Sequence, residues 1–336
     1  MKINVLGAGI IGSATAWALA KRGADVTLID PNPPGGLASA ASFGWINASH
    51  GNPRAYYDLR LASMAAWHRL KEEHPALPFR ADGTLYLHYD IDHETHFKEH
   101  SAWDYPLEWM DNAAIQKAEP NLANPPEAGL FAPLEGQLHV DGAARQFAEM
   151  FTELGGQIKH GMVQHLDLES VDMTVLAAGS ASDALAHSVD IELPLTAPPG
   201  LLIYSTPLPE RAVFHTLLTD GLHIQQRPDM RLVAGADFGG GAINDDPETG
   251  AKELFSRMKR AFPTLDLSYY GYTLGKRPTP SDGMPIIGRP KGRENLYITV
   301  MHSGATLAPI VAELAAQEIM TGDRDALLTP FNVDRF

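Results

Sequence analysis

The sequence contains no cysteine. This excludes disulfide bonds, thiolate metal ligands, a cysteine nucleophile and any cofactor attached through sulfur. The 336 residues also contain no run of the roughly 18 apolar residues that a membrane-spanning helix needs. Basic residues are scarce: the sequence has 26 Lys and Arg but 41 Asp and Glu, which gives a formal net charge of −15. Without a basic run to offset it, that charge argues against nucleic acid or an anionic membrane surface as a partner.

The remaining composition is that of a folded protein with many loops. Hydrophobic residues make up 44% and charged residues 20%, with 30 Gly and 25 Pro. At about 150 residues per domain, the length predicts two domains. Residues 2–6, Lys-Ile-Asn-Val-Leu, already form an apolar strand pattern that a cleavable leader would destroy. We therefore expect no signal peptide and a cytoplasmic protein.

The first 30 residues carry a nucleotide-binding pattern. The strand at residues 2–6 leads into Gly7-Ala8-Gly9-Ile10-Ile11-Gly12, which matches G-x-G-x-x-G, and a helix with an apolar face follows. Gly7 permits the tight turn, Gly9 lets a pyrophosphate approach the backbone, and Gly12 lets helix and strand pack closely. The start of the helix would bind the phosphates.

A carboxylate completes this pattern. A second strand, 26–29, ends at Asp30, which lies 18 residues after Gly12. In this position a carboxylate accepts both ribose hydroxyls and repels a 2′-phosphate, so the sequence disfavours NADP. The motif alone leaves FAD and NAD both open, with a purely structural turn as the third interpretation.

Three later segments add to the pattern. Small residues at 38–42 let the chain run beside a flat ligand. Residues 156–163 and 173–176 are predicted strands, and the second ends in Ala177-Ala178-Gly179. Near the C-terminus, residues 275–288 precede a strand at 296–300 and a helix to about residue 320, with Pro309 predicted in its first turn. The start of that helix would offer positive backbone dipole to an anion such as a reduced flavin.

In this order, these segments resemble the D-amino acid oxidase family of FAD-dependent amine oxidoreductases, whose members include glycine oxidase, sarcosine oxidase and D-amino acid dehydrogenase. The most specific element is the pairing of the N-terminal G-x-G-x-x-G with R-P-x-x-x-D-G-x-P-x-x-G at 277–288 and H-x-G at 302–304. Residues 118–122, Ala-Glu-Pro-Asn-Leu, are a weaker match. The resemblance covers somewhat under half of the chain.

The resemblance implies non-covalently bound FAD, held by residues from both ends and the middle of the chain. The residues that it assigns to the cofactor are Gly7, Gly9, Ile11, Gly12, Asp30, Ser39, Ala41, Ser42, Phe43, Gly44, Trp45, Val163, Ala178, Gly179, Ser303, Gly304, Ala305, Thr306 and Leu307.

The resemblance also implies active-site residues. Arg277 matches the arginine that pairs with the substrate carboxylate, and a guanidinium suits that task because it binds a carboxylate in bidentate fashion. His302 and His50 are candidates to line the site, as are Tyr204 and Tyr272. The relatives carry a further arginine in the segment that here is Met301-His-Ser-Gly, so the resemblance supplies no second carboxylate anchor. The chain is also short for the family, which leaves a more open site or one completed by a partner, such as a second copy in a homo-oligomer.

We predict an α/β fold with a Rossmann-like FAD-binding domain and a second, α+β substrate domain built on a mostly antiparallel sheet. The FAD-binding domain is assigned to 1–48, 140–185 and 272–336, and the substrate-binding domain to 49–139 and 186–271. Within the latter, a helix is predicted at 56–73, with Leu61, Met64, Ala65 and His68 on one side.

The predicted function is FAD-dependent oxidation of a small amino acid, of the D-amino acid, glycine or N-methylglycine type. Hydride would pass from the substrate Cα to flavin N5, and oxygen or a quinone-linked carrier would accept the electrons. The alternatives are a 2-hydroxy acid oxidoreductase, an NAD-dependent dehydrogenase and a flavin-binding protein without catalysis. His93, His96 and His100 follow helical spacing, but the run is one residue short of H-E-x-x-H, so we expect no metal site.

Overall fold

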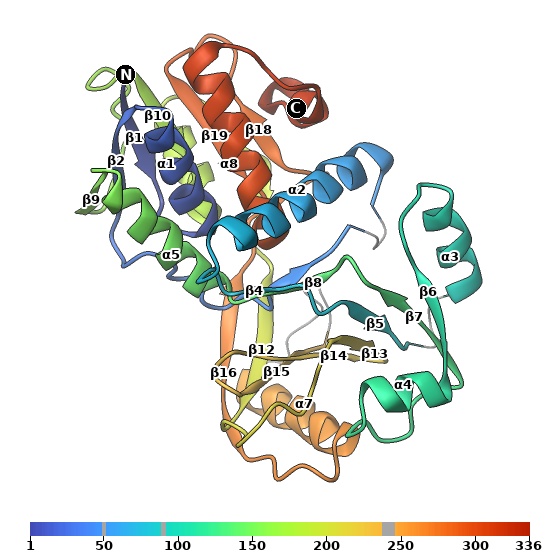
Figure 1. Cartoon of the computed structure of the whole chain (residues 1–336). Coiled ribbons are helices and arrows are strands. Elements are labelled where there is room, and N and C mark those ends of the chain that lie inside the picture. The colour runs from blue at the N-terminus through green and yellow to red at the C-terminus, as the bar shows by residue number, and fades with distance from the viewer. Residues whose placement is uncertain (49–51, 89–91, 237–245) are drawn as a thin grey trace.

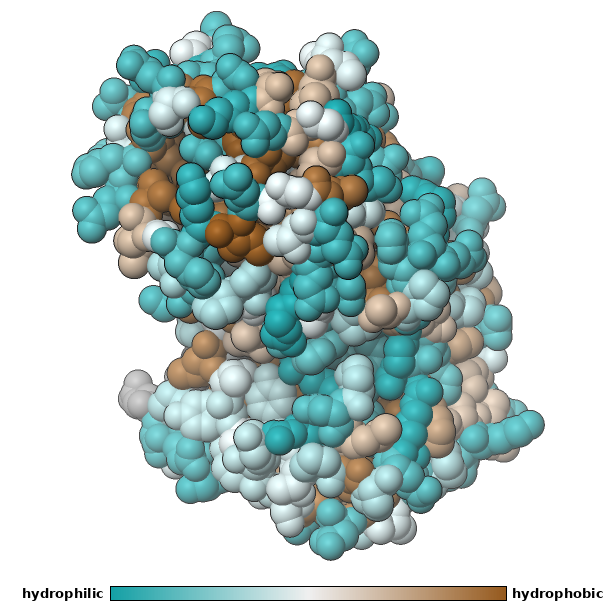
Figure 2. All heavy atoms as spheres, turned by 60° about the vertical axis from the view of Figure 1, so that its left-hand side comes forward, coloured by the Kyte–Doolittle hydropathy of each residue, from teal (hydrophilic) through white to brown (hydrophobic). Residues whose placement is uncertain are grey.

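A computed structural model describes residues 1–48, 52–88, 92–236 and 246–336. His50 therefore lies outside the described residues. Two large sheets with their helices form an upper and a lower part in Figure 1, and both chain ends lie in the upper part. Figure 2 shows hydrophilic side chains over most of both parts on the face that it displays, with apolar side chains in small groups.

The upper part is built on a six-stranded sheet. Its order is β18-β19-β10-β1-β2-β9, and every pairing is parallel except that of β18 with β19. The strands are β1 (Lys2–Leu6), β2 (Asp25–Asp30), β9 (Gln157–His160), β10 (Met173–Leu176), β18 (Ile286–Gly288) and β19 (Leu296–Val300). Helices α1 (Ile10–Lys21), α5 (Val140–Glu153), α6 (Ser182–His187) and α8 (Gly304–Thr321) belong to this part, and α1 packs against both α5 and α8.

The lower part is built on an eight-stranded sheet of order β16-β12-β15-β14-β13-β5-β7-β6. Only the pairing of β13 with β5 is parallel. The strands are β5 (Thr84–Tyr86), β6 (Glu108–Asp111), β7 (Ala128–Ala132), β12 (Pro199–Ser205), β13 (Thr216–Thr219), β14 (Leu222–Gln226), β15 (Leu232–Gly235) and β16 (Tyr269–Lys276). Helices α3 (His93–Ser101), α4 (Asn112–Ala118) and α7 (Pro247–Ala261) surround it (Figure 1). The predicted fold class, with a mostly antiparallel second sheet, is confirmed.

Two small sheets, one α-helix and three short 3₁₀ helices (Gly179–Ala181, Ala326–Phe331 and Val333–Arg335) complete the described chain. One sheet has the order β3-β8-β4, and β11 pairs with β17 in the other. The bounds are β3 (Trp45–Ile46), β4 (Phe79–Arg80), β8 (Gly136–Leu138), β11 (Leu195–Thr196), β17 (Thr279–Pro280) and α2 (Arg54–Glu73). None of the helices in the described ranges has the length and apolar character needed to cross a bilayer.

The predicted domain boundaries stay a prediction. Strand β16 continues to Lys276, so it crosses the predicted boundary at 272. Helix α2 lies in the stretch assigned to the substrate domain, but it packs against α8 of the upper part. Its most buried face also differs from the predicted one, because Tyr56, Arg60 and Trp67 are buried while Ala65 is exposed.

Pro309 lies in the second turn of α8, so its predicted place in the first turn is wrong. A proline inside a helix leaves the carbonyl four residues earlier without its N–H donor. That carbonyl belongs to Ala305, and the indole Nε1 of Trp67 on α2 donates to it at 3.0 Å. Trp67 Nε1 also lies 3.1 Å from the carbonyl of Thr306. The proline is therefore accommodated by a side chain of the neighbouring helix.

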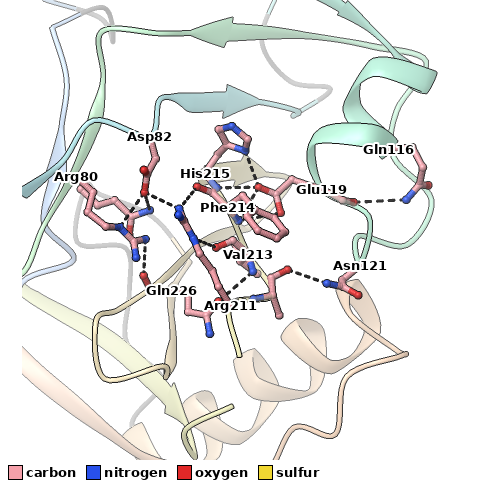
Figure 3. A network of polar contacts seen from close by, with 12 residues as sticks. Arg80, Asp82, Gln116, Glu119, Asn121, Arg211, Val213, Phe214, His215 and Gln226 are labelled. Atoms are coloured by element: carbon pink, nitrogen blue, oxygen red, sulfur yellow. Dashed lines mark hydrogen bonds and ion pairs between the residues drawn. The ribbon is translucent and has the colours of Figure 1, made fainter. Parts of the chain in front are cut away.

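The weaker match at 118–122 proves to contain a buried carboxylate that fixes a loop. Glu119, fully buried at the end of α4, accepts hydrogen bonds from the backbone N–H groups of Phe214 and His215 at 2.9 and 2.8 Å. His215 Nδ1 lies 2.8 Å from the same carboxylate (Figure 3). Arg211 in this loop pairs with Asp82 at 2.7 Å. These contacts position the connection between β12 and β13, and their role is structural.

Candidate active site

The parallel strands of the six-stranded sheet all end at one edge, and the glycine-rich turns meet there. Leu6, the last residue of β1, pairs in register with Ile29 of β2 and Leu176 of β10. Leu176 in turn pairs with Ile298 of β19. The turns after these strands begin at Gly7, Pro31, Ala177 and Met301. Segments far apart in sequence therefore form one edge, which is where open α/β sheets bind ligands.

The glycines of the first turn are required by close backbone packing. Gly7 has a φ of 104°, and a Cβ there would come within 2.4 Å of the carbonyl oxygen of Ala177. A Cβ on Gly12 would come within 1.8 Å of the carbonyl oxygen of Gly7. Gly12 thus lets α1 approach β1, as its place in the motif predicts.

The N-terminus of α1 is open to an acceptor. Gly9 is its N-cap residue, and its first turn contains no acidic side chain. The N–H of Ile10 donates to Ser39 Oγ at 3.1 Å, which shows that this end of the helix attracts an oxygen. Asp30 accepts from the N–H of Ala8 at 2.8 Å and from that of Asn32 at 2.7 Å. A carboxylate has about four acceptor positions, so these two bonds leave capacity for ribose hydroxyls.

A first cavity follows this edge and encloses about 1220 Å³, part of it open to solvent. Most residues that the sequence assigned to the cofactor line it: Gly7, Gly9, Ile11, Asp30, Ser39, Ser42, Val163, Ala178, Gly179, Gly304 and Ala305. A groove with glycine turns, a helix N-terminus and a carboxylate fits the phosphates and ribose of a dinucleotide.

A second cavity, of about 1030 Å³ including space open to solvent, adjoins the first and shares Ala38, Ser42, Pro278, His302 and Ala305 with it. Ala41, Phe43, Gly44, Trp45, Ser303 and Thr306 line it, as do Arg60, Lys276 and Arg277. Gly12 and Leu307 line neither cavity; Gly12 serves packing, and Leu307 is buried in the core. Tyr204 and Tyr272 line neither cavity.

The segment that borders both cavities is held in place by the lower sheet. Gln225 of β14 donates to the carbonyl oxygen of Phe43, and Arg227 Nη2 donates to that of Ser42 at 2.7 Å. Trp45 Nε1 donates to Thr84 Oγ1 at 2.9 Å and also contacts the buried carboxylate of Glu135 at 2.8 Å. These contacts fix the backbone beside the second cavity to the lower part of the molecule.

Arg277 lies in the second cavity, directly after β16. Its guanidinium packs on Gly200 of β12, where a Cβ would come within 2.7 Å of Nη2. Among the described residues that line this cavity, three are cationic and none is Asp or Glu. In a chain of net charge −15, this local excess of positive charge indicates a site for an anionic group.

His302 faces both cavities, and its environment keeps it neutral. His302 lines both cavities and is exposed there, while protein covers part of its side chain. This partial burial, together with the positive charges of Arg60 and Arg277, lowers the pKa of His302 to about 4. At neutral pH the imidazole is therefore a hydrogen-bonding group and not a cation.

Sequence reasoning missed Arg60, a buried arginine in the second turn of α2. It is 6% exposed, and its partners are neutral oxygens: Nε donates to the carbonyl of Asn47 at 2.9 Å, Nη2 to Asn47 Oδ1 at 2.7 Å, and Nη1 to Ser303 Oγ at 2.8 Å. The available signal was the spacing of Tyr56, Arg60 and Trp67, which places them on one helical face. That face packs on α8 and carries Arg60 into the site.

Two of the histidines of α3 lie against each other. The rings of His96 and His100 lie 4.2 Å apart between centroids, and His100 is buried. Within the described ranges, no group of three His, Asp or Glu side chains is placed to hold a metal ion.

Comparison with known proteins gives the family. The model of the FAD dependent oxidoreductase family (DAO) matches residues 2–318. Glycine oxidase from Bacillus licheniformis is 27% identical over 345 residues, which cover 94% of this chain and 92% of that protein. D-Amino acid dehydrogenase from Neisseria meningitidis is 25% identical and is matched over 100% of both chains. The crystal structure of glycine oxidase from Geobacillus kaustophilus superposes with a TM-score of 0.87 at 22% identity, covering 99% of this chain and 98% of that one.

These matches define the class: the chain belongs to the DAO family of FAD-dependent oxidoreductases. It is an enzyme, and FAD is its cofactor. The choice between FAD and NAD that the glycine motif left open is thereby resolved, and the interpretation as a flavin-binding protein without catalysis is wrong. The relatives matched here include amino acid oxidases and dehydrogenases.

Proposed function

We propose that this enzyme oxidises a small amino acid of the D-amino acid, glycine or N-methylglycine type to its imine, with Arg277 holding the substrate carboxylate. The observation that carries the proposal is the position of Arg277 in a cavity that adjoins the nucleotide groove and that, among the described residues, contains cations and no acid. The names of the relatives, glycine oxidase and D-amino acid dehydrogenase, favour the same substrate class.

In this proposal the cofactor and the protein have different roles. FAD, when bound, supplies the acceptor for the hydride that leaves the substrate Cα. The first cavity would hold the phosphates and ribose of FAD without a covalent bond. The second would take the ring system, bordered by Phe43, Gly44 and Trp45.

The remaining tasks of the chain are binding and orientation. Arg277 would fix the carboxylate through charge-assisted hydrogen bonds and so direct the Cα–H toward the ring. His302, being neutral, would offer a hydrogen bond to the substrate without adding a charge. The imine released by hydride transfer hydrolyses in water, so that step requires no residue of the protein.

The test is anaerobic bleaching of the flavin band near ~450 nm in purified holoenzyme, with a panel of D- and L-amino acids, glycine, sarcosine and 2-hydroxy acids. We expect amino acids to bleach the band. Arg277→Gln should raise the half-saturating substrate concentration at least about tenfold, because charged hydrogen bonds contribute about 1.5–3 kcal/mol each. The half-saturating concentration of Arg277→Lys should lie between those of the parent enzyme and Arg277→Gln, because lysine keeps the charge but loses the bidentate geometry.

A matched control is Lys291→Gln, which removes a positive charge from an exposed loop residue outside both cavities. The flavin of this variant should bleach with the same half-saturating substrate concentration as in the parent enzyme. Bleaching by hydroxy acids alone would overturn the amino acid assignment, and an unchanged half-saturating concentration in Arg277→Gln would overturn the role of Arg277. Reoxidation by oxygen, compared with a soluble quinone, then identifies the electron acceptor.

A further inference from the structure

Arg60 is a buried cation with no acidic partner among the described residues. Its three hydrogen bonds reach neutral oxygens of Asn47 and Ser303, and its guanidinium lies 5.2 Å from the ring centroid of Tyr56. A guanidinium has five N–H groups, so two remain without a partner in these contacts. Burying a charge without a counter-charge is costly, which indicates that an anion faces Arg60 in the working enzyme.

The contact with Ser303 places Arg60 at the positive end of α8. Ser303 is the N-cap residue of α8, yet its hydroxyl makes no capping bond within the helix and accepts from Arg60. The first turn of α8 contains no acidic residue. The partial positive charge of the helix start and the full charge of Arg60 therefore act on the same region. Ser303, Ala305 and Thr306 of this turn line the second cavity together with Arg60.

We propose that Arg60 and the N-terminus of α8 together form a cationic site for the negative charge that the FAD ring system acquires when it is reduced. The inference rests on the proposed placement of the ring in the second cavity. In that placement Arg277 serves the substrate and Arg60 serves the cofactor. Burial and the charges of Arg60 and Arg277 lower the pKa of His302, so the positive charge of this site resides in the guanidinium and the helix.

Sulfite gives a test without substrate, because it adds reversibly to the oxidised ring at N5 and leaves a negative charge on it. Sulfite affinity of the holoenzyme would be measured by loss of the flavin band, and the two-electron midpoint potential by reductive titration. In Arg60→Gln we expect sulfite affinity to fall at least about tenfold, since unit charges a few ångströms apart at a protein site interact by more than about 1.4 kcal/mol. A tenfold change corresponds to a potential lowered by about 30 mV.

The matched control is Arg69→Gln, on the same helix. Arg69 is exposed, pairs with Glu313 of α8 at 3.5 Å and lines neither cavity. Its removal changes the net charge as much as Arg60→Gln does, and both readouts should stay at the parent values. The sulfite affinity and midpoint potential of Arg60→Lys should lie between those of the parent enzyme and those of Arg60→Gln.

The outcomes separate clearly. If Arg60→Gln binds FAD and keeps the parent sulfite affinity and potential, the proposal is wrong. If these stay unchanged while an amino dicarboxylate saturates at a higher concentration, Arg60 binds substrate instead. If Arg60→Gln fails to fold, Ser303→Ala is the deciding variant, because it removes the oxygen that orients the guanidinium. We then expect a severalfold weaker sulfite affinity. An unchanged sulfite affinity would contradict the proposal. Neither readout involves an amino acid, so a failure here is distinct from a failure of the Arg277 assignment.

Discussion

His302 shows how a single residue is tuned by its surroundings. Its pKa of about 4 lies below the usual value of 6.5 because partial burial and two arginines disfavour the imidazolium. As pH falls from 6.5 toward 4, His302 becomes protonated in the unfolded chain but stays neutral in the folded chain. The free energy of unfolding therefore falls across this window, and the contribution of His302 is absent above it.

The prediction is that His302→Gln loses less stability than the parent protein between pH 6.5 and pH 4. Thermal or urea unfolding at several pH values measures this difference. The imidazole of His302, observed by NMR in histidine-labelled protein, should titrate near pH 4 and at a higher pH in Arg60→Gln. A midpoint near 6.5 for His302 would contradict the prediction.

Helices α2 and α8 depend on each other through a proline. Trp67 donates to the carbonyl of Ala305, which Pro309 leaves without its helical donor. Trp67→Phe should cost about 1–3 kcal/mol, because it leaves a buried carbonyl without a partner. In a Pro309→Ala background the alanine N–H supplies the missing donor, so the same change should cost less. Urea unfolding of the two single variants and the double variant measures this coupling. Additive effects would show that the indole does not compensate the proline.

The elements that the sequence predicted are those whose signals lie close together. The strand, glycine turn and helix at residues 2–21 follow from one continuous pattern, and the structure has them as β1 and α1. The start of α8 was misplaced because Gly304 follows a serine that does not cap the helix. Arg60 was missed because a charged residue in a helix pattern indicates an exposed face, whereas its burial depends on contacts with Asn47 and Ser303, which are remote in sequence.

At the scale of the whole molecule, the two cavities are lined by short segments that are widely separated along the chain. Their lining comes from separate stretches between residues 6 and 306 and from both sheets. A ligand bound there would stabilise the folded state as a unit. Sequence patterns reveal the stretches one by one, but their meeting at one sheet edge depends on strand order.

We expect FAD to raise the unfolding temperature of the apoprotein. At a free concentration 100 times its dissociation constant, a ligand that binds only the folded state adds about 2.7 kcal/mol, which corresponds to a shift of several degrees. Circular dichroism at increasing FAD concentration measures the shift. NAD⁺ at the same concentrations should produce none, and an equal shift with NAD⁺ would argue against the assignment of the first cavity.

Gly200 has a consequence for the size of the molecules that this enzyme accepts. The Arg277 guanidinium rests against the bare backbone of Gly200, with room only because no side chain is there. If Arg277 holds the substrate carboxylate as proposed, this contact would set the position of the guanidinium and hence the distance between the carboxylate and the bond to be broken. A methyl group at position 200 would displace the guanidinium and change that distance. The missing side chain would then limit the length of the substrate.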